Sequence, residues 1–175
     1  MKLFAPATRL SALAGLALSA MLAPAPALAG AAEAELLQSY VGSWKGRGIV
    51  TGAEQETVVC RMSIDRGNQD KVNYRGRCAM AGTTVSVNGT LAYIDASRRF
   101  EAAMTTNAGF SGIAVGRKQG SGVVFNLRER VEDEEGKPLT VTAAITLAGA
   151  RIMVDFNVVF NETGQSLAAA IPFTK

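Results

Sequence analysis

Residues 139–160 read LTVTAAITLAGARIMVDFNVVF, two alternating runs of apolar and polar side chains separated by Ala148-Gly149-Ala150. The apolar positions are Leu139, Val141, Ala143, Ile145 and Leu147 in the first run and Ile152, Val154, Phe156, Val158 and Phe160 in the second. A period of two places apolar side chains on one face of a β-strand and polar side chains on the other. Two such runs joined by a short turn of small residues predict an antiparallel hairpin.

The same pattern extends over most of the chain, because clusters of turn-forming residues separate short alternating runs from Gly42 onward. These clusters are Thr51-Gly52, Arg66-Gly67-Asn68, Ala81-Gly82, Asp95-Ala96-Ser97, Asn107-Ala108-Gly109, Gly120-Ser121-Gly122, and residues 133–136, 148–150 and 161–164. Nine turns imply about ten strands. Since an open sheet would leave exposed edges, we expect an all-β, antiparallel up-and-down β-barrel of about 8–10 strands with an apolar interior. A two-sheet sandwich is the alternative.

One segment, Ala31 to Tyr40, has a helical pattern and is expected to form a short N-terminal helix that closes one barrel end. Leu36, Leu37 and Tyr40 lie on one side of it. An outer-membrane barrel would use similar strands with the apolar face toward lipid. The absence of aromatic girdles from the sequence, and its Phe173-Thr174-Lys175 ending, disfavour that arrangement.

The first 29 residues have the three-part pattern of an export signal. Lys2 and Arg9 accompany an apolar stretch from Leu10 to Leu22, and Ala27-Leu28-Ala29 provides a small-x-small cleavage site. We expect cleavage after Ala29, which leaves residues 30–175 as a single barrel domain. No charged stop-transfer cluster follows, and the cleavage point carries no Cys for acylation. The predicted location is therefore periplasmic or secreted, with no membrane span after signal removal.

Charge and the lack of histidine exclude several classes of function. The whole chain has 18 Lys and Arg and 15 Asp and Glu. Cleavage of the predicted signal would remove two of the basic residues and none of the acidic ones, which leaves 16 basic and 15 acidic residues. This balance gives no electrostatic basis for nucleic-acid binding. The absence of His excludes His-ligated haem and zinc and the Ser-His-Asp and Cys-His nucleophile pairs. Without a phosphate loop or an activated nucleophile in the sequence, we expect a non-enzymatic protein with no cofactor.

The spacing of the acidic residues in the sequence does not match that of a known metal site. The run Glu132 to Gly136 lacks the alternating ligand spacing of calcium loops and falls where a hairpin turn is expected. Glu101, Glu129 and Asp155 lie on separate predicted strands, and the sequence does not bring them together. We therefore predict no bound metal.

Cys60 and Cys78 lie on the two arms of a predicted hairpin whose turn is Arg66 to Asp70. Facing residues of an antiparallel hairpin have numbers with a constant sum, and this pair centres the hairpin on Gln69, inside that turn. A disulfide needs Cα atoms about 5.5 Å apart, which is close to the separation of facing residues. In an oxidising compartment the spacing predicts a cross-strand disulfide.

The first predicted strand opens with Tyr40-Val41-Gly42-Ser43-Trp44-Lys45-Gly46-Arg47-Gly48. This opening resembles the Gly-x-Trp segment of lipocalins and the wider calycin barrels, and is most similar to that of bacterial lipocalin-like and nitrobindin-like domains. The resemblance implies a calycin-like barrel in which the Trp44 indole packs over the closed end while Gly46 and Gly48 let the strand bend. Nitrobindins hold haem through His, so that activity does not carry over to a chain without His.

Bacterial metalloproteinase inhibitors are also similar, as exported barrels with a Gly-x-Trp and one disulfide. Their N-terminal segment enters the cleft of the enzyme, and Gly30 to Glu35 would be the corresponding segment here. Inhibition of a proteinase is therefore one alternative function.

The leading functional prediction is a lipocalin-like binding protein for a small apolar ligand in the bacterial envelope. Barrels of this class hold small ligands, and Met side chains suit irregular apolar guests. The candidate ligand-lining residues are Trp44, Met62, Tyr74, Met80, Tyr93, Phe100, Met104, Phe125 and Phe156. The alternatives are that these side chains simply fill the interior, or that the protein is a proteinase inhibitor or a structural cell-envelope protein.

Five cations are expected on the opposite, outer face of the first three predicted strands. They are Lys45 and Arg47, then Arg61, then Arg75 and Arg77. Consecutive strands of a meander are neighbours, so these side chains could form a stripe for an anionic envelope polymer. The alternative is that they are ordinary solvated cations on strand exteriors.

Overall fold

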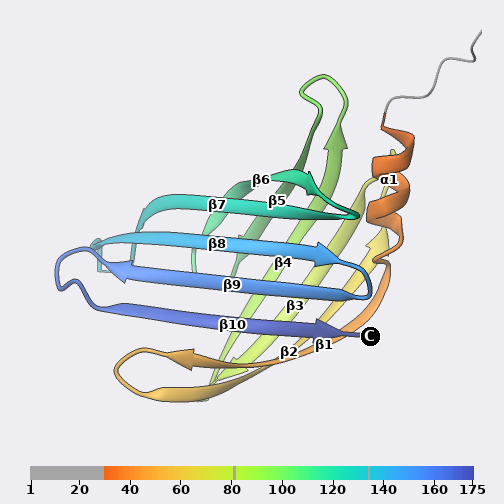
Figure 1. Cartoon of the computed structure of the whole chain (residues 1–175). Coiled ribbons are helices and arrows are strands. Elements are labelled where there is room, and N and C mark those ends of the chain that lie inside the picture. Colours follow the sequence, from red (N-terminus) through yellow and green to blue (C-terminus); the bar gives the residue numbers. More distant parts are fainter. Residues whose placement is uncertain (1–29, 81, 134) are drawn as a thin grey trace, which may run out of the picture.

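The computed structural model describes residues 30–80, 82–133 and 135–175, and the predicted signal peptide lies outside the described residues. Within these ranges the chain forms one helix followed by ten strands (Figure 1). The elements are α1 (Ala31–Gln38), β1 (Gly42–Thr51), β2 (Gln55–Arg66), β3 (Val72–Met80), β4 (Thr83–Ile94), β5 (Arg99–Thr106), β6 (Ser111–Gln119), β7 (Gly122–Glu132), β8 (Pro138–Ala148), β9 (Arg151–Phe160) and β10 (Ser166–Thr174).

Each strand pairs antiparallel with its neighbours in sequence, and β10 pairs with β1 to close the barrel. At this closure Lys45 of β1 lies opposite Thr174 of β10. The predicted antiparallel up-and-down barrel is therefore confirmed, with ten strands, and the sandwich alternative is wrong. The hydrophobic core cluster of the described residues lies on the inward strand faces and at the end of the helix, opposite to the arrangement of an outer-membrane barrel.

Glycines have two distinct roles in closing this barrel. Gly120 and Gly149 have φ values of 58° and 55°, a left-handed backbone that glycine adopts without a steric penalty in tight hairpin turns. At the β1–β10 seam, a Cβ on Gly48 would lie 2.3 Å from the carbonyl oxygen of Ala170. A Cβ on Gly46 would lie 2.8 Å from the ring of Phe173. The two β1 glycines of the opening motif thus make room for β10.

Helix α1 covers one end of the barrel and packs against β4. Leu37 is fully buried, and Tyr40, just after the helix, stacks on Trp44 with ring centroids 6.0 Å apart. The indole Nε1 of Trp44 donates a hydrogen bond of 2.9 Å to the Tyr40 carbonyl oxygen, and the Lys175 ammonium lies 5.0 Å from the centre of the indole ring. The indole is 2% exposed, so it seals this end as the resemblance implied.

The helix ends at Gln38, two residues before the predicted end at Tyr40. The hydroxyl of Ser39 donates a hydrogen bond of 2.6 Å to the carbonyl oxygen of Leu36, and the backbone N–H of Tyr40 donates to Leu37 in a turn. Among the described residues, no helix has the length and apolar character needed to cross a lipid bilayer.

Candidate functional site: the open half of the barrel and an outer groove

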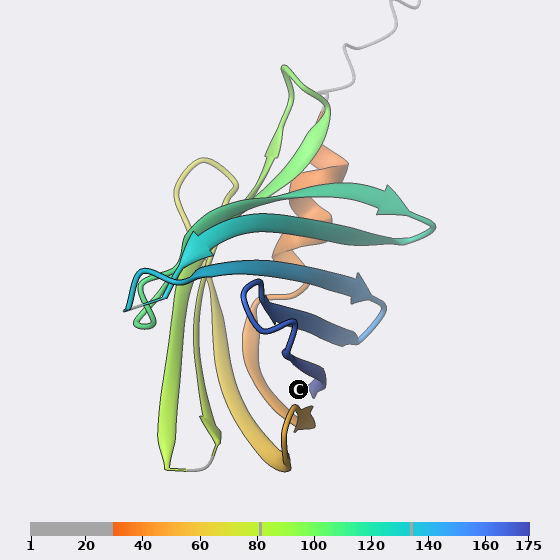
Figure 2. The same ribbon diagram turned by 90° about the vertical axis from the view of Figure 1, so that its left-hand side faces the viewer.

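The inward face of the barrel divides into two halves along the barrel axis. We call the end covered by α1 the packed half, and the end with the β7–β8 and β9–β10 turns the open half; these turns lie on the left of Figure 1, and Figure 2 views the barrel from that side. The inward side chains of the packed half are buried, among them Trp44, Ile64, Val72, Leu91, Phe100, Val123, Leu147, Ile152 and Phe173. This half is a solid hydrophobic core.

Inward side chains of the open half remain partly exposed although they are apolar. They include Met80 on β3, Val87 on β4, Met104 on β5, Val131 on β7, Leu139, Val141, Ala143 and Ile145 on β8, Val154, Phe156 and Val158 on β9, and Leu167 on β10. Val50, Val58 and Ala169 are buried, so the core continues along β1, β2 and β10. The partly exposed inward surface is therefore contributed mainly by β3–β5 and β7–β9.

The structure separates the nine predicted ligand-lining residues into two groups. Trp44, Tyr74, Phe100 and Phe125 are buried core residues, between 0% and 8% exposed. Met62, Met80, Met104, Phe156 and Tyr93 remain partly exposed.

Two of the partly exposed residues lie away from the centre of the open half. Tyr93 lies near the end of β4, at the end of the barrel covered by α1, with its ring edge-on to that of Phe100 and the ring centroids 5.0 Å apart. Met62 faces Trp44 across β1 and β2, so it lies at the level of the packed half although it is partly exposed. Met80, Met104 and Phe156 are thus the predicted lining residues that belong to the open half.

Tyr74 is a structural residue of the packed half. Its ring lies against Gly89, where a Cβ would approach the phenol oxygen to 2.4 Å, and its hydroxyl donates a hydrogen bond of 3.2 Å to the Ala103 carbonyl oxygen. Burial of the phenol raises the pKa of Tyr74 well above its usual value of 10.0. The hydroxyl therefore stays protonated and acts as a fixed donor between β3 and β5.

Glu129 is an inward-facing residue of the open half that the sequence reasoning did not place. On β7 it continues the inward series Val123, Phe125 and Leu127, and it faces Val141 on β8. It is partly buried and lies near Gly112 of β6. The period of two along β7 predicts an inward position for Glu129. A charged side chain, however, interrupts the apolar series and suggests that the inward face ends at Leu127. Its position gives the open half a carboxyl hydrogen-bond acceptor, in addition to Glu56, which lies opposite Val50 on the inward face of β2.

Cys60 and Cys78 form a disulfide between β2 and β3, as the spacing predicts. The two residues face each other directly in the strand register, with Cα atoms 4.0 Å apart. Cys60 is 1% exposed and lies on the inward face. The bond therefore links the two strands whose opposite, outer face carries most of the predicted cations.

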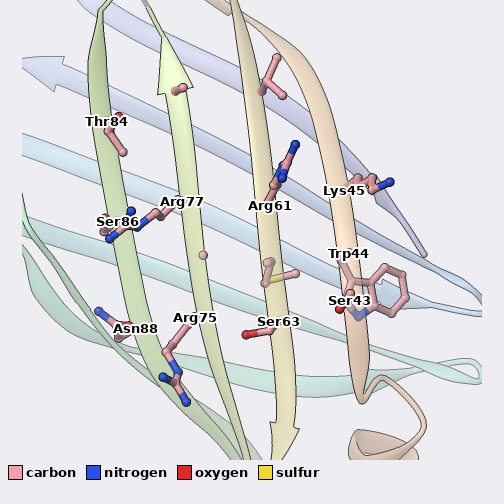
Figure 3. A pocket seen from close by; sticks show the side chains of 14 residues that line it. Ser43, Trp44, Lys45, Arg61, Ser63, Arg75, Arg77, Thr84, Ser86 and Asn88 are labelled. Carbon is pink, nitrogen blue, oxygen red and sulfur yellow. The ribbon is translucent and has the colours of Figure 1, made fainter.

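The outer face of β1–β4 holds a groove of about 820 Å³. It is lined by Ser43, Trp44, Lys45, Val59, Arg61, Met62, Ser63, Arg75, Gly76, Arg77, Ala79, Thr84, Ser86 and Asn88. Figure 3 shows the four cations of this lining, Lys45, Arg61, Arg75 and Arg77, together on these neighbouring strands. Arg47, the fifth predicted cation, is exposed on β1 opposite Val59 and does not line the groove.

The N-terminal segment proposed to enter a proteinase is held against the barrel. Within Gly30 to Glu35, residues from Ala31 are helical, and the carboxylate of Glu33 forms a 3.4 Å ion pair with Lys118 at the end of β6. A Cβ on Gly30 would lie 2.4 Å from Asp95, so the chain enters α1 in contact with the β4–β5 turn. This geometry offers no extended arm among these residues for an inhibitor mechanism.

The acidic turn between β7 and β8 uses its first carboxylate internally. The Oδ1 atom of Asp133 accepts hydrogen bonds from the backbone N–H groups of Glu135 at 2.9 Å and Lys137 at 2.8 Å. Glu101 pairs with Arg99 at 2.7 Å on the outer surface. In the described residues, no group of three or more Asp, Glu, Cys or His side chains is placed to hold a metal ion.

Comparison with known proteins shows the fold of this chain. No known protein family matches the sequence, and no curated protein matches it. The structure is similar to Rv2717c from M. tuberculosis, with a TM-score of 0.63, 15% identity, and coverage of 80% of this chain and 96% of that one. It is also similar to the S-type phycobiliprotein lyase CPES from Guillardia theta, with a TM-score of 0.56, 10% identity, and coverage of 81% and 90%.

These similarities agree with the closed, ten-stranded antiparallel barrel of this chain and concern its fold alone. The second one also corrects the prediction that the protein is non-enzymatic, because a barrel of this fold carries the name of a lyase. That prediction rested on the absence of His and of familiar nucleophile motifs, which excludes only part of enzyme chemistry. The lack of those motifs is therefore no argument against an enzymatic role.

Proposed function

We propose that this protein is a lipocalin-like binding protein that holds a small apolar ligand in the open half of the barrel. The observation that carries the proposal is that the inward apolar side chains of β3–β5 and β7–β9 are partly exposed in the open half. Residues of the same kinds are buried in the packed half. The similarity to other barrels of this type is consistent with ligand binding.

The physical driving force is the removal of these side chains from water. Full burial of a Leu, Ile, Phe or Met side chain stabilises by about 1.5–3 kcal/mol, and partial exposure leaves part of that gain for a ligand to supply. Met80 and Met104 adapt to irregular apolar shapes because their unbranched side chains have several rotatable bonds. Glu129 favours a ligand with one hydrogen-bond donor on an otherwise apolar body.

Export to the periplasm or beyond is part of the proposal. Its support is the signal-like pattern of the first 29 residues and the Cys60–Cys78 disulfide, since disulfides persist in oxidising compartments. Expression of the full chain in a bacterial host followed by cell fractionation and N-terminal sequencing tests it. We expect a periplasmic protein that begins at Gly30; an uncleaved cytoplasmic product would contradict export.

Binding itself is tested by titrating the purified protein with the neutral fluorescent probe N-phenyl-1-naphthylamine. Two adjacent residues of β8 provide a matched pair of variants, because Ala143 faces inward between Leu127 and Phe156 while Ala144 faces outward between Asn126 and Asp155. Ala143→Phe should fill the open half and raise the Kd of the probe at least about tenfold, since most of its apolar contacts are lost. Ala144→Phe should leave the Kd within about twofold.

Thermal melts of both variants establish that they are folded before the titrations are compared. No saturable probe binding to the wild-type protein, or equal loss in the two variants, would contradict a ligand site in the open half. Native mass spectrometry of protein purified without denaturation then identifies what occupies the site.

A further inference from the structure

Three cations face one another in a row across the outer face of β1–β3. In the strand register Lys45 lies opposite Arg61, and Arg61 lies opposite Arg77. Neighbouring strands are about 4.8 Å apart, so the three side chains originate within roughly 10 Å. Like charges placed directly opposite each other destabilise a sheet. The row is therefore unfavourable unless an anion lies over it.

A fourth cation belongs to the adjacent row of the same groove. Arg75 lies opposite Ser63 on β2 and Asn88 on β4, and Arg77 lies opposite Ser86. These hydroxyl and amide groups add neutral hydrogen-bond donors beside three guanidinium groups, each of which presents five N–H donors in a fork. The groove is thus rich in hydrogen-bond donors carried by four neighbouring strands (Figure 3).

Among residues 30–80, 82–133 and 135–175, no carboxylate lines the groove to compensate these charges. Its lining contains no Asp or Glu, and the salt bridges of the described residues join other pairs: Arg99 with Glu101, Lys118 with Glu33, and Lys137 with Glu135. Two acidic residues of β2 lie close to the groove in sequence but do not line it. Asp65 lies opposite Asn73, one outward position beyond Ser63, and Glu56 lies on the inward face of the strand. The four cations are left for an external anion.

We propose that this groove binds an organic ligand that carries two or more phosphate groups. One phosphate monoester carries about −1.5 to −2 charges at pH 7, so a single group would leave about two of the four cations uncompensated. A terminal phosphate offers three acceptor oxygens, against two for a carboxylate, and guanidinium forks bind phosphate oxygens in pairs. Clustered phosphates therefore match both the charge and the donor density.

The apolar edge of the groove indicates that the ligand is organic. Val59, which is 46% exposed, and Ala79 lie opposite each other in the next row toward the open half. They provide a surface for a carbon skeleton beside the cationic row. The four cations, Val59 and Ala79 lie on the outer face of β1–β3, whereas Met80, Met104 and Phe156 of the open half face the interior, so the two sites are separate.

Isothermal titration calorimetry with fructose 1,6-bisphosphate and with sodium tripolyphosphate tests the proposal at fixed ionic strength. Both probes should bind with Kd values at least about tenfold lower than those of inorganic monophosphate and of citrate, because charge-assisted hydrogen bonds to several groups accumulate. The double variant Arg61→Gln/Arg77→Gln should raise both Kd values at least about tenfold. The fold of the variant is verified by its retained binding of N-phenyl-1-naphthylamine and by its melting temperature.

The matched control is Arg128→Gln/Arg130→Gln, which removes two exposed cations from the outer face of β7, away from the groove. It should leave the Kd values within about twofold. Tighter binding of the sugar bisphosphate than of tripolyphosphate supports a role for Val59 and Ala79. An equal loss in the control, citrate binding as tight as that of the phosphates, or no measurable binding would overturn the proposal. Probe binding in the open half is unaffected by each of these outcomes, so the two proposals fail separately.

Discussion

The packed half and the open half of the barrel are built from the same alternating strands, yet their inward side chains have different environments. Phe125 and Phe156 illustrate the contrast: both face inward, but Phe125 is fully buried and Phe156 remains partly exposed. Alternation therefore decides which face of a strand points inward, and the closure of the barrel end decides whether that face is covered.

The packed half is covered because two elements close its end. Helix α1 brings Leu37 and Tyr40 over the core, and the Trp44 indole fills the space beneath them. At the opposite end the strands finish in turns, and small or slender residues such as Ala143 and Val141 face inward. We infer that stability is concentrated in the first half and binding in the second, and each prediction below tests that division.

The largest expected effect separates the two phenylalanines. Phe125→Ala should lower the free energy of unfolding by about 3–5 kcal/mol, because it opens a cavity in a fully packed region. Phe156→Ala should cost clearly less, because part of its ring is already in water, but should weaken binding of N-phenyl-1-naphthylamine. Urea unfolding and probe titration of both variants provide the measurements. Equal losses of stability would contradict the division into two halves.

Removal of the disulfide should have the next largest effect. The two cysteines are 18 residues apart, and a cross-link of that span stabilises a protein by about 3 kcal/mol in the loop-entropy description. Cys60→Ala/Cys78→Ala should therefore lower the free energy of unfolding by roughly 2–4 kcal/mol. Because the bond holds β2 and β3 together, hydrogen exchange should increase first in these strands. Exchange that increases equally throughout the barrel would argue against a local role.

Tyr74→Phe should have a smaller, pH-dependent effect. Loss of the hydrogen bond to Ala103 should cost about 1 kcal/mol near neutral pH. Burial raises the pKa of Tyr74 above 10.0, so folding favours the neutral phenol and the wild-type protein loses stability as the pH rises above about 10. The variant should lose less over the same pH range; Tyr40, whose pKa burial also raises, contributes equally to both proteins. Denaturant unfolding from about pH 8 to 11.5 measures the difference, and parallel curves would contradict the assignment.

The smallest expected effect has the opposite sign and concerns the outer face. Arg61→Gln removes the central cation of the row formed with Lys45 and Arg77, so it should raise the free energy of unfolding by about 0.2–1 kcal/mol in the absence of ligand. The gain should shrink in concentrated salt, which screens the repulsion in the wild-type protein. Arg128→Gln serves as the control and should change stability little. A destabilised Arg61→Gln protein would show that this side chain has a structural partner.

Much of the architecture follows from local sequence signals. The turn clusters and the period-two runs predict the strands, and the position of Gln69 between Cys60 and Cys78 predicts the register of the β2–β3 hairpin and its disulfide. The same register places Arg61 opposite Arg77. These features could be predicted because hairpin contacts are made between residues close in sequence.

Features that depend on contacts between distant segments could not be predicted from the pattern. The approach of Gly48 to Ala170 at the β1–β10 seam joins the two ends of the barrel, and no local signal reports it. The partial exposure of Phe156 depends on what covers the barrel end. Glu129 was missed for a different reason: its inward position follows from alternation, but its charge conceals the pattern.

Methionine-methyl NMR tests the central division most directly, because the described part of the chain contains three inward methionines and one outward methionine. Met62, Met80 and Met104 face the interior, whereas Met153 of β9 lies on the outer face, opposite Thr146 and Pro172. On titration with N-phenyl-1-naphthylamine, we expect saturable shifts at Met80 and Met104, a smaller shift at Met62 and none at Met153. Unchanged inward methyl signals, or a dominant shift at Met153, would contradict a binding site in the open half.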